Sequence, residues 1–217
     1  MRTKAVLFDF DGTLADTLPV IFHAFQTVFR RHDRREVSPD EIIGMFGPPE
    51  EGILRKELSH CGSLEEAVKE FYHLYEENHT RLVRPSGDIR DLLAFLRDRS
   101  YRTAVITGKG RRTFEISARE LGLSDAFDVT ITGNDVEKAK PDPEGILRAL
   151  DELGAAKEEA VFLGDSDADI AAGKAAGLRT YGVLWLPTTQ ASEFREKPDA
   201  VFRRTAQLRE LLEGEAG

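Results

Sequence analysis

The sequence predicts an α/β fold, in which helices flank a parallel sheet and an all-helical subdomain is inserted after the first strand. Near its start the chain has a short apolar run, residues 5–8, that does not alternate with polar residues. Such a run is typical of a strand buried on both faces of a parallel sheet. A long helical block follows, and from residue 83 onward apolar runs alternate with amphipathic segments. Because that alternation is the pattern of βα units, it predicts a Rossmann-like parallel sheet core.

The helical block is expected to be an insertion between two parts of the core. Serine residues at 38 and 63 stand where helices begin, each followed by acidic residues, and glycines and prolines at 44–49 interrupt the helical pattern. The expected helical segments are residues 19–31, a segment that begins at residue 38 and is interrupted at Gly44, residues 50–58 and residues 63–81. We therefore expect the insertion to span residues 16–82, and the α/β core to combine residues 1–15 with residues 83–217.

The remaining elements of the core follow in strict alternation. The expected strands are the apolar runs at residues 103–106, 129–131, 160–163 and 180–185. The expected helices are the segments with an apolar stripe, residues 89–97, 113–121, 143–153 and 170–176. In open sheets of this kind, ligands bind outside the carboxyl ends of the strands. Polar residues at the strand ends are therefore the candidates for a functional site.

Composition limits the functions that this chain can have. Its 217 residues are 41% hydrophobic and 32% charged, and a folded chain of this size buries roughly 70% of the surface that its unfolded form exposes. One cysteine, Cys61, excludes a disulfide framework and a multi-cysteine zinc site within one chain. There is no apolar signal region at the N-terminus and no run long enough to span a membrane. We therefore expect a cytoplasmic protein without a membrane partner.

The net charge and the apolar faces of the expected helices indicate which classes of partner this chain can bind. The net charge of -9 disfavours nucleic acid, because binding a polyanion requires a basic face. Small anions remain compatible, since a divalent cation, one or two lysines and helix N-termini can make a site locally positive. Apolar faces on the inserted helices fit either core packing or a dimer, so a monomer and a homodimer are both open.

The most informative motif directly follows the first expected strand. Asp9 and Asp11 lie two residues apart in an extended segment, so their side chains can face one pocket. Gly12 lets the backbone turn sharply and approach a ligand. Two carboxylates in one pocket indicate either a metal site or acid/base chemistry.

Three further motifs fall at other strand ends. Thr107, Gly108 and Lys109 offer a hydroxyl, a backbone N–H and an ammonium before a helix, which together suit an anion. Lys140 precedes a loop that two prolines stiffen, and an acidic run from Asp165 to Asp169 follows the 160–163 strand. Taken singly, these motifs also fit turn chemistry, an ordinary loop and a helix cap. Their joint occurrence at the ends of different strands of one sheet favours a shared site.

Electrostatics predicts a cation at that site. Two carboxylates about 4 Å apart repel by roughly 4 kcal/mol at an effective dielectric constant near 20, so Asp9 and Asp165 cannot converge in ionised form without a counter-charge. A hard divalent cation with oxygen ligands resolves the repulsion, and magnesium is the ion that such sites favour. The acidic run resembles a calcium loop in its spacing, but Ile170 stands where that loop needs glycine.

These four motifs, in this order, resemble the haloacid dehalogenase superfamily, in particular its phosphatases with a helical cap inserted after the first motif. The resemblance covers essentially the whole chain and is most specific at residues 9–14. It implies that Asp9 is the nucleophile that forms an aspartyl-phosphate, and that Asp11 protonates the leaving group and then activates water. The acid at Asp11 is what implies phosphate-ester chemistry, since the dehalogenases of the superfamily lack an acid there.

The resemblance also assigns the remaining site residues. The implied phosphate-binding residues are Gly12, Thr107, Gly108 and Lys140. The implied ligands of Mg²⁺ are Asp9, Asp165 and the backbone carbonyl of Asp11, with Asp169 orienting Lys140 or a metal-bound water. The candidate substrate contacts are His23, Phe46, Gly47 and Lys109. For Phe46 and Gly47, an ordinary connection between two helices is the alternative interpretation.

The implied activity is hydrolysis of a small phosphorylated metabolite. Similarity is greatest to the phosphoglycolate phosphatase-like and pyrophosphatase-like members, and a sugar-phosphate mutase of the β-phosphoglucomutase type shares the layout. A non-catalytic phosphate-binding regulatory module on the same fold is the alternative from another functional class. Release of inorganic phosphate distinguishes hydrolysis from the mutase reaction.

Overall fold

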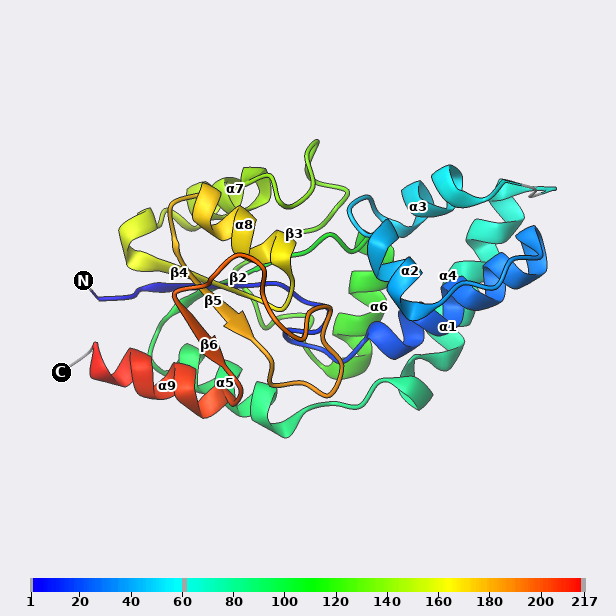
Figure 1. Cartoon of the computed structure of the whole chain (residues 1–217). Coiled ribbons are helices and arrows are strands. Elements are labelled where there is room, and N and C mark those ends of the chain that lie inside the picture. Colours follow the sequence, from blue (N-terminus) through cyan, green and yellow to red (C-terminus); the bar gives the residue numbers. More distant parts are fainter. Residues whose placement is uncertain (1, 60–61, 216–217) are drawn as a thin grey trace.

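A computed structural model describes residues 2–59 and 62–215 (Figure 1). Within these residues, six parallel strands form one sheet in the order β3-β2-β1-β4-β5-β6. The strands are β1 (Ala5–Phe8), β2 (Arg102–Ile106), β3 (Val129–Ile131), β4 (Ala160–Gly164), β5 (Arg179–Val183) and β6 (Ala200–Phe202). The predicted α/β fold with a Rossmann-like parallel sheet is confirmed.

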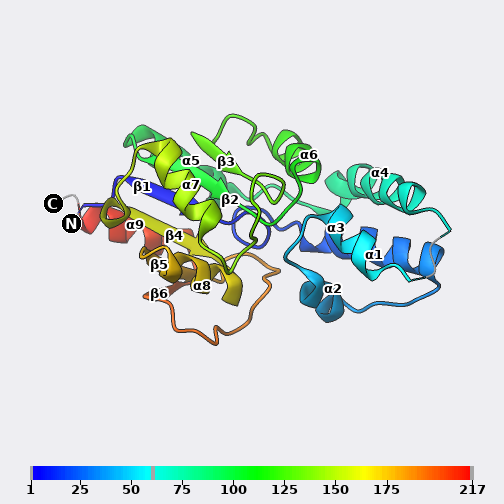
Figure 2. The same ribbon diagram turned by 90° about the horizontal axis from the view of Figure 1, so that it is seen from above.

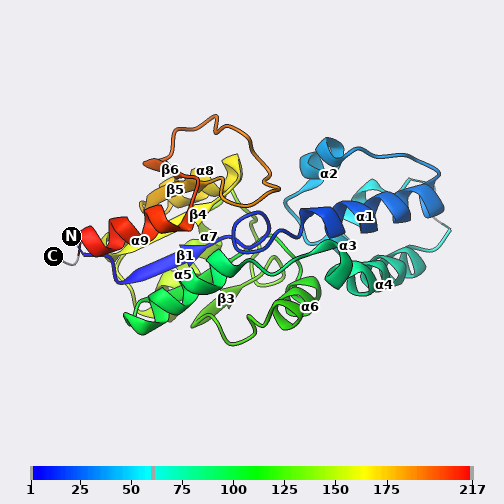
Figure 3. The same cartoon turned by 90° about the horizontal axis from the view of Figure 1, so that it is seen from below.

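Strand β1 lies in the middle of the sheet and is buried on both faces. It pairs with β2 on one side and β4 on the other. Val6 and Phe8 point into one apolar cluster, and Ala5 and Leu7 point into another. The helices that contribute to these clusters include α5 (Gly87–Asp98) and α9 (Thr205–Gly214) on the first face, and α7 (Glu144–Leu153) and α8 (Asp167–Ala175) on the second (Figures 2 and 3). This burial explains the unbroken apolar run in the sequence.

The chain between β1 and α5 is helical. Its α-helices are α1 (Leu18–Val28), α2 (Pro39–Met45), α3 (Glu50–Glu57) and α4 (Leu64–Leu82). They share an apolar cluster in which the Phe25 and Phe71 rings lie 4.6 Å apart, and Ile116 of α6 (Arg111–Leu121) joins that cluster from the other part of the chain. Figures 2 and 3 show these helices beside α6, beyond one end of the sheet. None of the described helices is long and apolar enough to cross a lipid bilayer.

Serine caps fix the start of several helices. Ser38 accepts a hydrogen bond from the Glu41 backbone N–H, and the Glu41 carboxylate accepts one from the Ser38 N–H, which forms a capping box. Ser63 caps α4 in the expected place. Ser166 forms a second capping box with Asp169, so α8 begins at Asp167 rather than at the expected residue 170.

The structure differs from the expectation in three places. The helix expected over residues 19–31 ends at Val28 and continues as the wider turn η1 (Phe29–Asp33), which Arg34 closes in a left-handed conformation with φ 53°. A short 3₁₀ turn, η2 (Lys157–Glu159), precedes β4. The edge strand β6 and helix α9 were not expected from the sequence. A three-residue strand carries almost no periodicity of its own, and β6 is held by its pairing with β5.

Candidate active site

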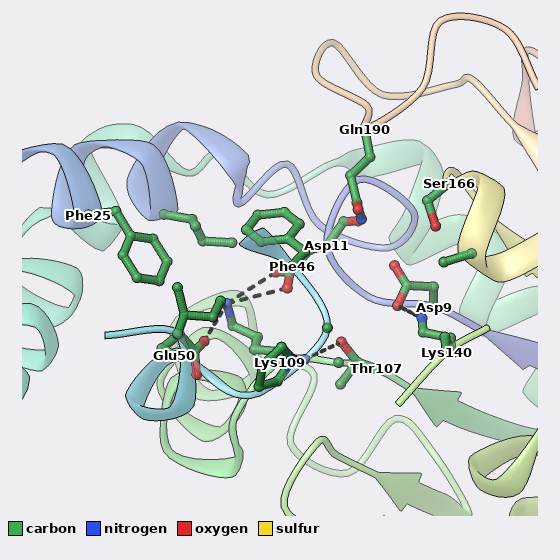
Figure 4. Close-up of a pocket in the computed structure, with 16 residues that line it drawn as sticks. Asp9, Asp11, Phe25, Phe46, Glu50, Thr107, Lys109, Lys140, Ser166 and Gln190 are labelled. Carbon is green, nitrogen blue, oxygen red and sulfur yellow. Dashed lines mark hydrogen bonds and ion pairs between the residues drawn. The ribbon is translucent and has the colours of Figure 1, made fainter. Parts of the chain in front are cut away.

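A cavity of about 100 Å³ lies between the carboxyl ends of the strands and the inserted helices (Figure 4). The core contributes mostly polar lining residues, among them Asp9, Asp11, Thr107, Gly108, Lys109 and Lys140. The insertion contributes mostly apolar ones, among them Ile21, Phe25, Phe46, Pro48 and Ile53, together with the acid Glu50. The cavity therefore has a charged side and an apolar side.

Asp9 stands immediately after β1, where its backbone N–H donates to Leu163 O at 2.8 Å and so extends the pairing with β4. The residue is only 2% exposed. Oδ1 accepts a hydrogen bond from Lys140 Nζ at 2.6 Å, whereas Oδ2 is buried and has no hydrogen-bond partner. Burial raises the pKa of Asp9 to about 7, although Lys140 opposes the shift. One oxygen of Asp9 is thus oriented by Lys140 and the other is available to a ligand.

Lys140 connects Asp9 to a second acid. Its ammonium lies 2.6 Å from Asp9 Oδ1 and 2.6 Å from Asp169 Oδ1, and it also donates to Ile106 O at 3.2 Å. Although burial opposes the charge, Asp169 and Asp9 raise the pKa of Lys140 above its usual value. Lys140 is therefore a fixed positive charge beside Asp9.

Three carboxylates converge behind the cavity. Ligand atoms of Asp9, Asp165 and Asp169 lie within 4.8 Å of one another. Asp169 is already satisfied, because its Oδ2 accepts bonds from the N–H and the hydroxyl of Ser166 at 3.0 and 2.6 Å. Burial, together with the charges of Asp9 and Asp169, raises the pKa of Asp165 well above its usual value. These all-oxygen donors and the unpartnered Asp9 Oδ2 fit a hard divalent cation.

Gly12 permits the close approach of the first motif to Asp165. Its φ is +83°, and a Cβ atom at this position would lie 2.1 Å from Asp165 Oδ2. A side chain here would therefore displace Asp165, so the turn after Asp11 requires glycine.

Asp11 lies in different surroundings from Asp9. Thr17 Oγ1 donates to Asp11 Oδ1, and Lys109 Nζ lies 3.2 Å from the same oxygen. The Lys109 side chain is fully buried, with its ammonium 4.5 Å from the centroid of the Tyr75 ring. Burial opposes the charge of Lys109, but Asp11, Tyr75 and Glu50 raise its pKa above the usual value. The two aspartates of the first motif thus each have their own lysine.

Gln190 is a lining residue that sequence reasoning missed. It lies in the long loop between β5 and β6, where its backbone N–H donates to Asp165 Oδ2 at 2.5 Å and its side-chain amide donates to Asp11 O at 3.4 Å. It therefore contacts both a candidate carboxylate ligand and the candidate carbonyl ligand. No sequence motif marks this glutamine, because the contact with Asp11 joins residues 179 positions apart.

The structure brings most of the predicted site residues into one place. Those that line the cavity are Asp9, Asp11, Phe46, Gly47, Thr107, Gly108, Lys109 and Lys140. Gly12, Asp165 and Asp169 adjoin Asp9, as described above. A Cβ atom on Gly108 would lie 3.6 Å from Gly47 O, so the loop of the insertion touches the core loop here. His23 is not among the described residues that line this cavity, to which its helix α1 contributes Ile21 and Phe25.

Sequence comparison identifies the class of protein that has this fold and site. The family model of the haloacid dehalogenase-like hydrolases matches residues 6–183. The chain therefore belongs to the haloacid dehalogenase-like hydrolases.

Individual relatives match nearly the whole chain. The pyrophosphatase PpaX of Bacillus pumilus is 32% identical over 206 residues, covering 94% of this chain and 94% of the relative. The crystal structure of CbbY from Rhodobacter sphaeroides in complex with phosphate has a TM-score of 0.82 at 26% identity, covering 95% of this chain and 96% of that one. A predicted phosphoglycolate phosphatase from Haemophilus somnus shares the fold with a TM-score of 0.82 at 22% identity, covering 97% and 98%.

Proposed function

We propose that this protein is a phosphatase that hydrolyses a small phosphorylated metabolite through a phosphorylated Asp9. The observation that carries the proposal is the carboxylate of Asp9, which lines the cavity with Oδ1 fixed by Lys140 and with Oδ2 buried and unpartnered. A carboxylate held in this way can attack phosphorus in line, because phosphoryl transfer depends on positioning and charge neutralisation. The pyrophosphatase relatives and the phosphate-bound CbbY support phosphoryl chemistry at this site.

The proposed reaction has two steps. A carboxylate oxygen of Asp9 forms a bond to phosphorus while the ester P–O bond breaks, and Asp11 gives a proton to the leaving oxygen. Water then attacks the phosphorus of the aspartyl-phosphate, and Asp11 takes its proton, so that inorganic phosphate leaves and the Asp9 carboxylate is restored. The Lys140 ammonium neutralises charge that develops on the transferred group. The Thr107 hydroxyl and the Gly108 N–H are proposed to bind its oxygens.

The resident cofactor proposed for this site is Mg²⁺. Asp9, Asp165 and the Asp11 carbonyl would hold the ion, which supplies positive charge against the phosphoryl oxygens when it is bound. Asp169 is proposed to orient Lys140, since its oxygens already accept hydrogen bonds from Lys140 and Ser166. Gln190 would hold Asp165 in place from the loop above it.

We also propose that residues 16–82 form a cap on a core of residues 1–15 and 83–217. The cap supplies Ile21, Phe25 and Phe46 to the cavity, so its closure would exclude water from the reacting groups. Exclusion of water strengthens the interactions of Lys140 and Asp9 with the phosphoryl group, because the local dielectric constant falls.

Release of inorganic phosphate tests the proposed function. A panel of phosphoglycolate, pyrophosphate, sugar phosphates and nucleotides would be incubated with the protein in magnesium or in EDTA. We expect magnesium-dependent release from at least one small phosphate compound. Formation of an isomeric phosphate ester without release would instead indicate a mutase. Absence of both release and labelling of Asp9 across the panel would favour a non-catalytic phosphate-binding module.

Magnesium is expected to stabilise the fold more strongly at about pH 8 than at about pH 6. Burial raises the pKa of Asp9 to about 7, so the metal-free folded state binds more protons than the unfolded state between about pH 4 and pH 7. The stability of the metal-free fold therefore falls as the pH rises through this window. Magnesium must displace the proton at low pH but meets an ionised ligand at high pH.

Thermal unfolding with saturating magnesium chloride and with EDTA measures this difference, because binding to the folded state alone raises the melting temperature. Calcium chloride at the same concentration serves as the ion control. A melting-temperature increment that is equal at both pH values, or larger at the lower one, would contradict the assignment of Asp9 as a metal ligand.

A further inference from the structure

The cap carries one buried acid that the proposed reaction does not use. Glu50 is the first residue of α3 and is only 5% exposed. Its carboxylate accepts hydrogen bonds from the Gly110 N–H at 2.9 Å and from Thr113 Oγ1 at 2.5 Å, and it lies 3.8 Å from Lys109 Nζ. The two donors and the ammonium all belong to the core, so Glu50 links the cap to the loop and helix that follow β2.

These donors form a pocket for an anion. Gly110 is the N-cap residue of α6, a helix that has no acidic residue in its first turn and no side-chain cap of its own. The amide of a helix N-terminus, a hydroxyl and an ammonium together favour a negative group. Glu50 fills this position from a distant part of the sequence. A Cβ atom on Gly110 would lie 2.4 Å from Glu50 Oε2, so glycine makes room for the carboxylate.

Glu50 changes the charge that a substrate meets on the cap side of the cavity. Of the described residues that line the cavity, Lys109 and Lys140 are the basic ones. Lys140 is engaged by Asp9 and Asp169, and Lys109 is shared by Asp11 and Glu50. In Figure 4, Glu50 and Phe25 lie on the opposite side of the cavity from Asp9 and Lys140. A leaving group on that side therefore meets apolar walls and two carboxylates around one ammonium.

We propose that Glu50 is a specificity-determining residue, which restricts the enzyme to phosphate monoesters whose leaving group carries no second negative charge. This inference rests on the proposed phosphatase function and names its substrate class. An additional carboxylate or phosphate on the substrate would be repelled by Glu50, and it would compete with Glu50 for the Lys109 ammonium. A neutral hydroxyl-bearing or apolar group meets neither penalty.

Two esters of the same skeleton test this inference. 2-Phosphoglycolate carries a carboxylate where 2-hydroxyethyl phosphate carries a hydroxymethyl group, so they differ mainly in the second charge. We expect wild type to have the higher kcat/KM for 2-hydroxyethyl phosphate. Glu50→Gln removes the charge and keeps one side-chain oxygen that can accept from the Gly110 N–H, while its amide nitrogen replaces the oxygen that faces Thr113 Oγ1 and can donate to that hydroxyl. It should shift the ratio of kcat/KM toward phosphoglycolate by about tenfold.

The matched control is Glu51→Gln, because Glu51 is the exposed neighbour whose carboxylate accepts from the Tyr72 hydroxyl and does not line the cavity. It should leave the ratio unchanged. If Glu50 had only a structural role, Glu50→Gln would lower kcat/KM for both esters by the same factor. That result would overturn the inference. So would a wild-type preference for phosphoglycolate, which can be measured even if Glu50→Gln does not fold.

A binding measurement separates failure of this inference from failure of the proposed function. Dissociation constants of both esters are measured by calorimetry with Asp9→Asn, alone and combined with Glu50→Gln, in magnesium. If wild type hydrolyses neither ester, the proposed phosphatase function fails for this substrate class, while the ratio of dissociation constants still tests Glu50. Tighter binding of 2-hydroxyethyl phosphate that Glu50→Gln reverses supports the inference, and an unchanged ratio overturns it.

Discussion

Replacing Asp9 by asparagine is expected to abolish turnover while leaving the fold intact. The substitution keeps the shape of the side chain and its hydrogen bond with Lys140, but it removes the nucleophilic oxygen. Because no other described carboxylate has a buried, unpartnered oxygen facing the cavity beside Lys140, we expect no substitute nucleophile. The loss of kcat should be on the order of 10⁴-fold or more, as for removal of a nucleophile in other enzymes that use covalent catalysis.

The stability of Asp9→Asn separates chemistry from folding. Burial and the neighbouring charges of Asp169 and Asp11 raise the pKa of Asp9, so the ionised carboxylate is costly in the metal-free protein. A neutral amide removes this cost, and the melting temperature in EDTA at about pH 8 should be equal to or above that of wild type. Magnesium should no longer raise it.

The control for this experiment is Asp167→Asn. Asp167 belongs to the same acidic run as Asp165, but its carboxylate accepts a bond from the Arg195 backbone N–H and does not line the cavity. It should retain turnover within a few-fold of wild type. Substantial turnover in Asp9→Asn, with phosphate release at a rate near that of this control, would remove Asp9 from the role of nucleophile.

The fold and the core of the site were predictable because they depend on local patterns. An unbroken apolar run predicts a strand buried on both faces, and β1 is buried on both faces. The parallel arrangement then brings strand ends to one edge of the sheet, which is why the sequence alone groups Asp9, Thr107 and Asp165. Each of these residues directly follows a strand, or lies within a few residues of one, and the apolar run of that strand can be recognised in the sequence.

Glu50 and Gln190 were not predictable, because their environment is created by contacts between distant segments. Glu50 follows two prolines and begins an amphipathic helix, so in the sequence it resembles an ordinary acid in the first turn of a helix. Its burial depends on α6 lying against the insertion, more than 50 residues further along. Gln190 lies in a loop without periodicity. Local patterns therefore identify groups that strands present, but not those that the helices between β1 and α5 and the loops bring to them.

The C-terminal region shows the same limit within the fold itself. Helix α9 has Leu208 and Leu212 buried four residues apart, which is a helical signal. The preceding strand β6 has only three residues, which are too few to show a periodic pattern. Without that strand, the sequence did not indicate where α9 would pack against the sheet. Pairing of β6 with β5 supplies the place, and this pairing is a tertiary contact.

Replacing Lys140 by methionine is expected to impair both turnover and stability, with a pH dependence that identifies the cause. Methionine preserves much of the volume of the side chain but leaves Asp9 and Asp169 without their shared ammonium. Removing one partner of a buried ion pair typically costs about 3–5 kcal/mol of unfolding free energy. Loss of the charge that neutralises the phosphoryl group should lower kcat by about 10²–10³-fold.

The stability cost of Lys140→Met should grow between about pH 5 and pH 8. Lys140 lowers the pKa of Asp9, so without it Asp9 holds its proton to higher pH. The folded state of the variant then binds more protons than its unfolded state across this range, and its stability falls as the pH rises. Lys138→Met is the matched control, because Lys138 is exposed and makes its hydrogen bond to Glu144 through the backbone. Chemical denaturation of both variants at the two pH values, in EDTA, measures the difference.

Magnesium then separates the two roles of Lys140. The ion should restore part of the stability of Lys140→Met, since it places positive charge among the same carboxylates, but kcat should stay low because the ammonium beside Asp9 Oδ1 is still missing. Full recovery of kcat in magnesium would mean that Lys140 only balances charge in the fold. Equal stability of the two lysine variants at both pH values would mean that the ion pairs of Lys140 with Asp9 and Asp169 do not contribute to the stability of the fold.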